Sequence, residues 1–267
     1  MASPTVRENV ATLSVQKLAE LRKAIAGMQA ISDNRGFNYW AGVHGVPQWK
    51  CWHHNVLGNS NQHLTYPLFL PWHRAYLYHF EQYLKDIVPT SALHWWNWET
   101  PPSSPSKLPT AYSAATGANG QPNPLLKSHI NYPASHLQRD TKRDSGSSPG
   151  MSLPTPADVQ NLWTLSSFIA FSGQLENLHD DVHGWTGGLH GDMGTIAVAA
   201  FDPIFWAHHA MIDRLWFIWQ EKFGQGTGIP THMLDSVLDP FNMKVSDVLH
   251  VEALGYTYAD SSSQVLI

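Results

Sequence analysis

Cysteine is nearly absent from this chain: Cys51 is the single one among 267 residues. One thiol cannot form an internal disulfide, so a disulfide-stabilised scaffold is excluded. Charged side chains are also scarce, at 14% of the residues with a formal net charge of −5. A basic stripe, the usual footprint of nucleic-acid binding, is missing. We therefore expect no nucleic-acid partner.

Long apolar runs are missing too. No stretch approaches the ~20 consecutive apolar residues of a membrane-spanning helix, so we expect no membrane partner. Residues 1–9 lack the apolar segment of a signal peptide, which favours a cytoplasmic location. The chain has no internal repeat of fixed period, and its length suits one large core. We expect residues 1–267 to form a single domain.

Histidine and tryptophan, by contrast, are abundant, with 16 His and 12 Trp. Many aromatics beside few charges indicate a compact, well-buried interior. Apolar periodicity and capping residues predict helices over residues 15–30, 71–87, 157–171, a segment around His179, and 202–223. Residues 34–67 and 101–156 are predicted to be irregular, and Tyr256 and Tyr258 alternate as in a strand. The predicted fold is mainly α, a four-helix bundle with long irregular loops.

A pair of histidines stands on the helix around residue 179. His179 and His183 are four residues apart, and residues i and i+4 share one face of a helix. We expect a break at Ser172-Gly173 before this helix and expect Gly184 to end it. Both imidazoles then point the same way, as two ligands of one metal ion must.

Two further histidines stand on the next helix. Asp202 before Pro203 is a strong helix start, because the carboxylate caps the helix and proline needs no N–H partner at the first position. Gly224 occupies the usual stop position. His208 and His209 lie between these ends. Three imidazoles from two packed helices can form a trigonal metal site.

The first half of the chain repeats this arrangement. His73 lies near the start of the helix that Pro71 opens, and the loop before it is rich in histidine. The loop residues that could ligate a metal are His44, Cys51, His53, His54 and His63. Two clusters of about three imidazoles result. Imidazole binds zinc, copper, iron and nickel, and two all-histidine clusters favour a redox-active metal pair over a zinc-binding helical module.

These segments also resemble a known family, the type 3 copper proteins, which comprise tyrosinases, catechol oxidases (polyphenol oxidases) and hemocyanin units. The segments from Leu175 to Gly188 and from Asp202 to Trp216 resemble the family's CuB region. The other matching segments are His44 to Pro47 and Phe69 to Arg74, which resemble the CuA region, and Tyr256 to Tyr258, which resembles the family's tyrosine motif. The resemblance implies two copper ions, with O2 as co-substrate, inside a helical bundle.

The resemblance assigns most of the copper ligands. It implies His179, His183 and His209 for CuB, and His44 and His73 for CuA, while His208 is only a neighbour of His209. The second CuA ligand departs from the family pattern, because the usual position holds Leu64. His53 is the predicted ligand, since Cys51-Trp52-His53 resembles the Cys-x-His motif in which the thiol forms a thioether bond. His63 and His54 are the alternatives, and Cys51 as a plain buried thiol is another.

Three more residues take roles by resemblance. Glu176 matches a carboxylate that can hold a water near CuB and act as general base, unless it is a surface charge. Asp180 follows the first CuB histidine, where it orients that water or the His183 region, or faces solvent. Ile196 matches the position of a gating phenylalanine in plant catechol oxidases, so a smaller gate leaves the CuA side more open.

The family implies an oxidoreductase. We expect oxidation of o-diphenols to o-quinones by O2, together with ortho-hydroxylation of monophenols, so a small phenol is the expected substrate. The alternatives are a hemocyanin-like O2-binding module and an o-aminophenol or catechol oxidase without monophenolase activity. The chain ends soon after Tyr258, which leaves no room for the covering domain of an O2 carrier and favours an enzyme. A copper-delivery chaperone is a further expected partner.

Overall fold

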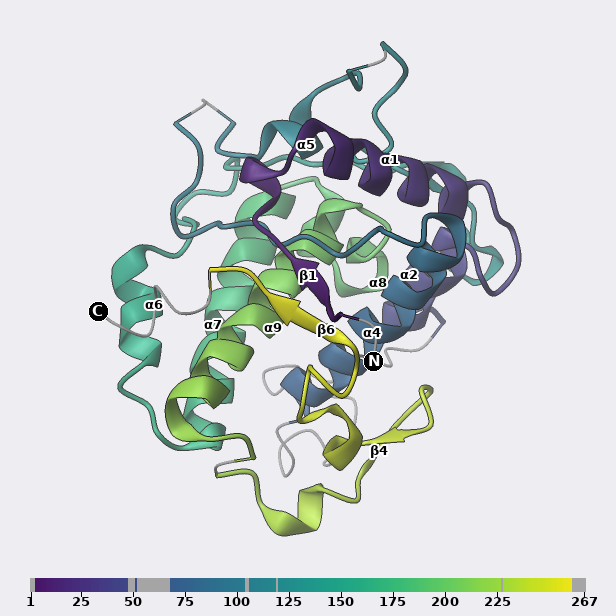
Figure 1. The fold of residues 1–267 in the computed structure, drawn as a ribbon. Helices are drawn as coiled ribbons and strands as arrows, with labels where there is room; N and C mark the ends of the chain where they lie inside the picture. The colour runs from purple at the N-terminus through teal and green to yellow at the C-terminus, as the bar shows by residue number, and fades with distance from the viewer. Residues whose placement is uncertain are drawn as a thin grey trace.

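The computed structural model describes residues 3–47, 51, 68–103, 106–118, 120–226 and 228–260. It is mainly helical, and four helices form its centre (Figure 1). These are α2 (Phe37–Gly45), α4 (Phe69–Ile87), α7 (Phe168–Gly187) and α9 (Ile204–Phe223). Helices α4, α7 and α9 contact one another, and α1 (Val15–Gln29) covers α2 and α4. The predicted helical bundle is confirmed.

Helix α9 is the core of this bundle. Every residue from Ile204 to Gln220 is buried, and a helix that is buried on all sides must lie inside the molecule. The helix ends at Phe223, where Gly224 has a φ of 94°. That left-handed backbone favours glycine, so the predicted stop is confirmed.

The remaining elements are short. The other α-helices are α5 (Thr110–Ser113), α6 (Pro156–Leu162) and α8 (Ile196–Ala199). The 3-10 helices are η1 (Val10–Thr12), η2 (Pro133–Ser135), η3 (Asp192–Gly194), η4 (Thr231–Met233) and η5 (Val245–Val248). The strands are β1 (Thr5–Arg7), β2 (His129–Ile130), β3 (Arg139–Asp140), β4 (Val237–Leu238), β5 (Met243–Lys244) and β6 (Tyr256–Tyr258).

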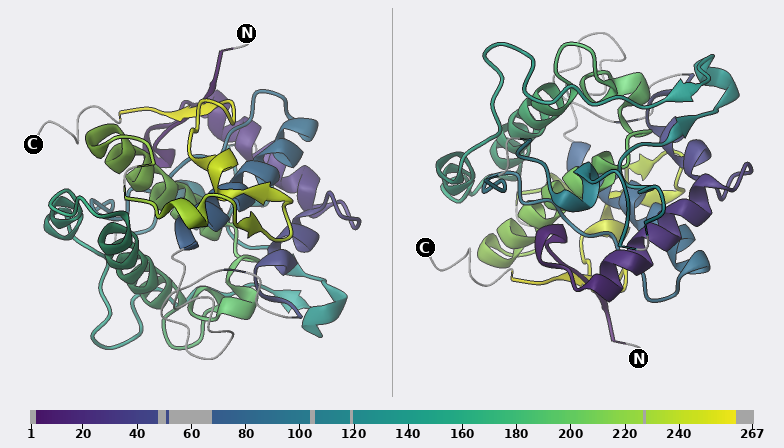
Figure 2. Two further views of the ribbon diagram at one scale, coloured as in Figure 1. Left: turned by 90° about the horizontal axis from the view of Figure 1, so that it is seen from below. Right: turned by 90° about the horizontal axis from the view of Figure 1, so that it is seen from above.

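Two strands from opposite ends of the chain lie side by side. Strand β1 pairs with β6 in parallel, with Thr5 opposite Tyr256 and Arg7 opposite Tyr258. Figures 1 and 2 show the purple N-terminal strand beside the yellow C-terminal one. The alternating tyrosines were predicted to form a strand, and β6 confirms it.

Three predictions about the helices are wrong. The helix predicted over residues 157–171 is interrupted, because α6 ends at Leu162 and α7 begins at Phe168. Helix α2 lies in the segment that was expected to be irregular. Seven of its nine residues are buried, so the sequence lacks the alternation of a polar and an apolar face that would have predicted a helix. Helix α7 runs unbroken through Ser172-Gly173 and past Gly184. Its end is at Gly188, with a φ of 58°, where an added Cβ would lie 1.9 Å from the Asp144 carbonyl oxygen. Burial of Ser172 in the bundle outweighs its weak helix propensity.

In the part of the chain that is described, no helix is long and apolar enough to cross a membrane.

Candidate metal centre

Helices α7 and α9 bring three imidazoles to one point. The Nε2 atom of His209 lies 3.3 Å from that of His179 and 3.3 Å from that of His183. The rings of His179 and His183 are 4.4 Å apart, as their spacing of four residues predicted. His208 joins this group, and one ligand atom from each of the four residues lies within 4.8 Å of the others. The residue types and distances suit a metal ion.

Helices α2 and α4 add two more histidines beside this group. The ring of His73, on the second turn of α4, stacks on that of His209 at 4.4 Å. The ring of His44, near the end of α2, lies 5.8 Å from His73 and 6.3 Å from His209. Five of the six predicted ligands therefore meet at the centre of the bundle. The second CuA ligand, whether His53, His54 or His63, lies outside the described residues.

Backbone carbonyls orient three of these rings. The Nδ1 atoms of His44, His73 and His183 lie 3.0, 2.8 and 2.7 Å from the carbonyl oxygens of Ile196, Phe69 and Met193. A carbonyl can only accept a hydrogen bond, so each Nδ1 must carry the proton. Each Nε2 then keeps its lone pair for a metal ion, the usual arrangement of metal-binding histidines.

His179 is oriented by a carboxylate instead. Its Nδ1 lies 3.0 Å from Oδ1 of Asp180, whose side chain is 47% exposed. Asp180 therefore faces solvent on one side and holds His179 on the other. Of the predicted roles, orientation of a neighbouring histidine fits this contact, although the ring concerned is that of His179 and not that of His183.

Burial keeps these imidazoles neutral. It lowers the pKa of His44 to about 3 and the pKa of His73 and His209 well below the ordinary value, with neighbouring histidines adding to the effect. Burial also lowers the pKa of His183, against a hydrogen bond to the Met193 carbonyl that raises it. Neutral imidazoles need lose no proton to bind a metal ion. An all-nitrogen, water-poor site of this kind fits copper or zinc and does not fit magnesium or calcium.

A glycine lets α8 approach the end of α2. A Cβ added to Gly45 would lie 2.7 Å from the Ile196 carbonyl oxygen and 2.6 Å from the Ala197 Cα. The same carbonyl accepts the hydrogen bond from His44. Ile196, predicted as a gate through its side chain, thus contacts the site through its backbone, while its side chain is half-buried.

Glu176 and Cys51 lie close to each other and to the histidines. Glu176 is fully buried on α7, three residues before His179 and so on the same side of the helix. The backbone N–H of Cys51 donates to the His44 carbonyl at 3.2 Å. Burial and then the Glu176 carboxylate raise the pKa of the Cys51 thiol. Glu176 is therefore no surface charge, while the predicted thioether partner, His53, lies outside the described residues.

Aromatic rings line the centre. The ring of Phe69 lies 4.7 Å from that of His73 and 4.8 Å from that of His179. On the other side, the ring of Phe205 lies 4.1 Å from that of His209 and 4.9 Å from that of His44. These contacts pack the imidazoles between apolar rings.

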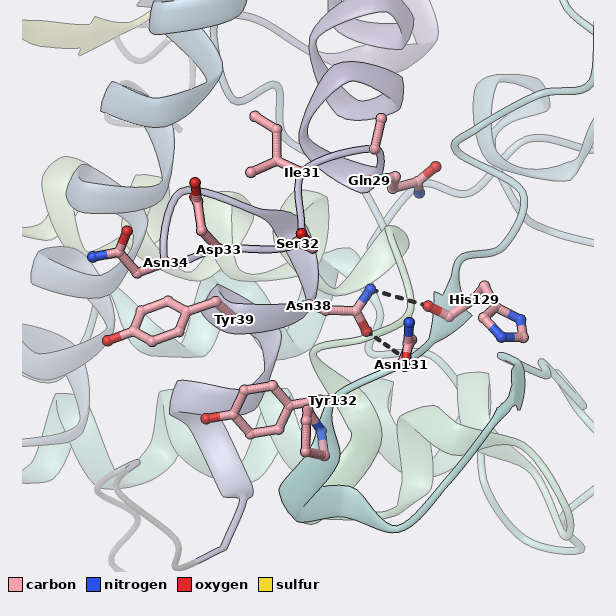
Figure 3. A pocket seen from close by; sticks show the side chains of 12 residues that line it. Gln29, Ile31, Ser32, Asp33, Asn34, Asn38, Tyr39, His129, Asn131 and Tyr132 are labelled. Atoms are coloured by element: carbon pink, nitrogen blue, oxygen red, sulfur yellow. Dashed lines mark hydrogen bonds between the residues drawn. The ribbon is translucent and has the colours of Figure 1, made fainter.

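A separate pocket opens at the surface. It has a volume of about 480 Å³ and lies between the end of α1, the start of α2 and the segment around β2 (Figure 3). The Asn38 side chain spans it, donating to the His129 carbonyl at 3.1 Å and accepting from the Asn131 N–H at 2.9 Å. None of the predicted copper ligands that the structure describes lines this pocket.

A family model and individual known proteins both match this chain, and the two comparisons agree with each other. The family model described as the common central domain of tyrosinase matches residues 34–222. The chain is 30% identical to a chloroplastic polyphenol oxidase of Malus domestica, over 89% of this chain and 45% of that protein. It is 29% identical to a tyrosinase of Streptomyces antibioticus, over 95% of this chain and 99% of that protein. The chain thus spans less than half of the apple protein and nearly all of the bacterial one.

A solved structure shares the fold. A functional unit of octopus hemocyanin superposes with a TM-score of 0.79 over 96% of this chain and 68% of that chain. The two sequences are 24% identical.

Proposed function

Because this chain belongs to the tyrosinase family, we propose that it is an oxidase that uses O2 to convert o-diphenols into o-quinones. Two copper ions, with O2 as co-substrate, are the cofactors of this family, and the four-histidine group fits such metals. The observation that carries the proposal is the meeting of five histidines from four helices, with two Nε2–Nε2 distances of 3.3 Å. We further propose that monophenols are ortho-hydroxylated.

The proposed ligands follow the two halves of the site. His179, His183 and His209 hold one ion, and His44 and His73 hold the other together with a third imidazole, for which His53 is the first choice and His63 and His54 are the alternatives. Copper held by neutral imidazoles supplies the redox chemistry, since it cycles between the +1 and +2 states. The protein supplies fixed ring orientations and a dry surrounding.

Glu176 is the proposed general base. Its buried carboxylate lies on the histidine side of α7, where it can take the proton of a phenolic hydroxyl as the substrate binds. His183 is the one partly exposed residue among the five histidines, which supports substrate entry on that side. Ile196 supports the monophenolase proposal, because its side chain is smaller than a gating phenylalanine and leaves more room beside His44.

Oxygen uptake is the test. The metal-free chain, reloaded with copper, should consume O2 with a catechol and, more slowly, with the matching monophenol. The same chain loaded with zinc is the control and should consume none. Uptake with the catechol alone would remove the monophenolase proposal, and no uptake with either would remove the oxidase proposal.

A second candidate is an O2-binding module. The shared fold with an octopus hemocyanin unit supports it. In that case the copper-loaded chain would bind O2 reversibly without oxidising catechol, so the same assay separates the two.

The single domain, the cytoplasmic location and the copper-delivery chaperone stay predictions from the sequence. A single hydrophobic core among the described residues supports the first of these.

A further inference from the structure

His208 is an unusual residue in this bundle. Its side chain is fully buried, and among the buried histidines of the described ranges it is the one whose two ring nitrogens both lack a hydrogen-bond partner. A neutral imidazole offers one donor and one acceptor, and buried groups of this kind are almost always satisfied. Two unsatisfied nitrogens on one buried ring destabilise the folded protein, so they require an explanation.

The surroundings of His208 supply one. Its ring stacks on that of His179 at 5.1 Å and meets that of His183 edge-on at 4.9 Å. One ligand atom of His208 lies within 4.8 Å of those of His179, His183 and His209. One ring nitrogen of His208 is therefore beside three other candidate ligands.

The spacing suits four ligands of one ion. Two nitrogens bound tetrahedrally to zinc at ~2.0–2.1 Å lie about 3.3 Å apart. The Nε2 atom of His209 is 3.3 Å from that of His179 and 3.3 Å from that of His183. The ligand atom of His208 lies within 4.8 Å of these three nitrogens, so a closer approach of this one ring completes the set.

We propose that His208 is a metal ligand, and that the copper-free protein binds one zinc-class divalent ion in a closed site. The four ligands of this site, called the tetrad here, are His179, His183, His208 and His209. Four protein ligands leave no open position, which is typical of structural zinc sites, whereas a catalytic ion keeps one position open. The tetrad shares three residues with the proposed CuB site, so zinc bound there excludes copper from it.

The test uses metal binding and no oxidation assay, so its outcome is independent of the proposed oxidase activity. The metal-free full chain receives one equivalent of Zn²⁺, and X-ray absorption at the zinc edge counts the imidazoles bound to the ion. Zinc affinity is measured in parallel by competition with a chelating dye. His208→Phe removes both ring nitrogens at similar volume, and His190→Phe makes the same change at an exposed histidine.

Wild type and His190→Phe should bind zinc through four imidazoles. His208→Phe should show three imidazoles and one oxygen, with affinity lower by at least about tenfold, as expected when a metal site loses a supporting group. Three imidazoles in the wild type, or unchanged affinity in a folded His208→Phe, would overturn the proposal. If circular dichroism shows that His208→Phe does not fold, the count in the wild type decides alone.

Discussion

Single hydrogen bonds set the chemistry of each histidine in this centre. Three rings donate from Nδ1 to carbonyls of the backbone, which no side-chain substitution removes. His179 alone among these four relies on a side chain, the carboxylate of Asp180. Substitution of Asp180 can therefore remove the hydrogen bond that orients a proposed ligand while the ligand itself, His179, is unchanged.

Asp180→Ala removes the acceptor from His179. We expect copper affinity to fall by about 10- to 100-fold, as for other residues that orient metal ligands. Folding should change little, because Asp180 is half exposed. The measurement is copper competition with a chelator. Asp181→Ala, at the exposed neighbouring position, is the control, and equal affinity in the two variants would contradict the orienting role.

Glu176→Gln tests the proposed base. The amide keeps the shape of the side chain and cannot take a proton, so catechol oxidation per bound copper should fall by about 10²- to 10⁴-fold. Copper content should stay at the wild-type value, which separates loss of chemistry from loss of metal. An unchanged rate in a copper-replete Glu176→Gln would exclude Glu176 as the base.

At the scale of elements, close contacts between helices position the ligands. Helix α8 touches α2 at Gly45, and this contact brings the Ile196 carbonyl to His44. Gly45→Ala should separate the two helices, destabilise the fold by roughly 1–3 kcal/mol and weaken copper binding. Thermal unfolding and copper analysis measure both effects.

Gly173→Ala is the matched control for this change. Gly173 lies inside α7 with no atom within 4 Å of an added Cβ. Alanine there should stabilise the helix by about 1 kcal/mol and leave copper content unchanged. If Gly45→Ala behaved in the same way, the proposed role of the α2–α8 contact would be wrong.

A buried carboxylate joins α4 and α9 behind the histidines. Asp213 Oδ1 accepts from Arg74 Nε at 2.5 Å, and Oδ2 accepts from Arg7 Nη1 at 3.2 Å. The hydroxyls of Tyr256 and Tyr258 donate to the same Oδ2 at 2.7 and 2.6 Å. Arg74 follows His73, and Asp213 stands one turn after His209, so this cluster sets how the two ligand-bearing helices lie.

Asp213→Ala leaves two buried arginines without this partner, and we expect a loss of about 3–5 kcal/mol in the free energy of unfolding. Burial raises the pKa of Asp213, but Arg74 and Arg7 outweigh it and hold the pKa below the ordinary value. Its contribution to stability is therefore present above the unfolded-state pKa and lost as pH falls through the lowered folded-state pKa. In denaturant titrations, Asp213→Ala should lose less stability than the wild type does as pH falls across that acidic range.

The exposed carboxylate of Asp235, which pairs with Lys244, provides the control. Asp235→Ala should leave stability near that of the wild type, because exposed ion pairs contribute little. Equal losses in the two variants would contradict the structural importance of the Asp213 cluster.

The elements that the sequence predicted well are those with local signals. Ser14 accepts from the Lys17 N–H and starts α1, and Gly224 ends α9. The i, i+4 spacing placed His179 and His183 on one face. Helix α2 was missed because its burial comes from neighbours distant in sequence. His208 was set aside because the family resemblance makes the second histidine of the pair, His209, the ligand, and only the packing of α7 against α9 shows that both rings reach the same group.

On the scale of the whole molecule, the two ends of the described chain close the bundle. Strand β1 lies beside β6 (Figure 1). Arg7 of β1 and Tyr256 and Tyr258 of β6 donate to the same buried carboxylate. The Arg7 guanidinium also lies 3.6 Å above the Tyr256 ring. The arrangement of the helices thus depends on contacts such as that between Arg7 and Tyr258, 251 residues apart, which local sequence patterns do not predict.

The central claim is that histidines from these helices hold two copper ions. The most direct measurement is the copper content of the reloaded and desalted chain by atomic absorption, for the wild type and for His179→Ala. We predict two copper ions per chain in the wild type and at most one in the variant. One copper or none in the wild type, or two in His179→Ala, would contradict the account.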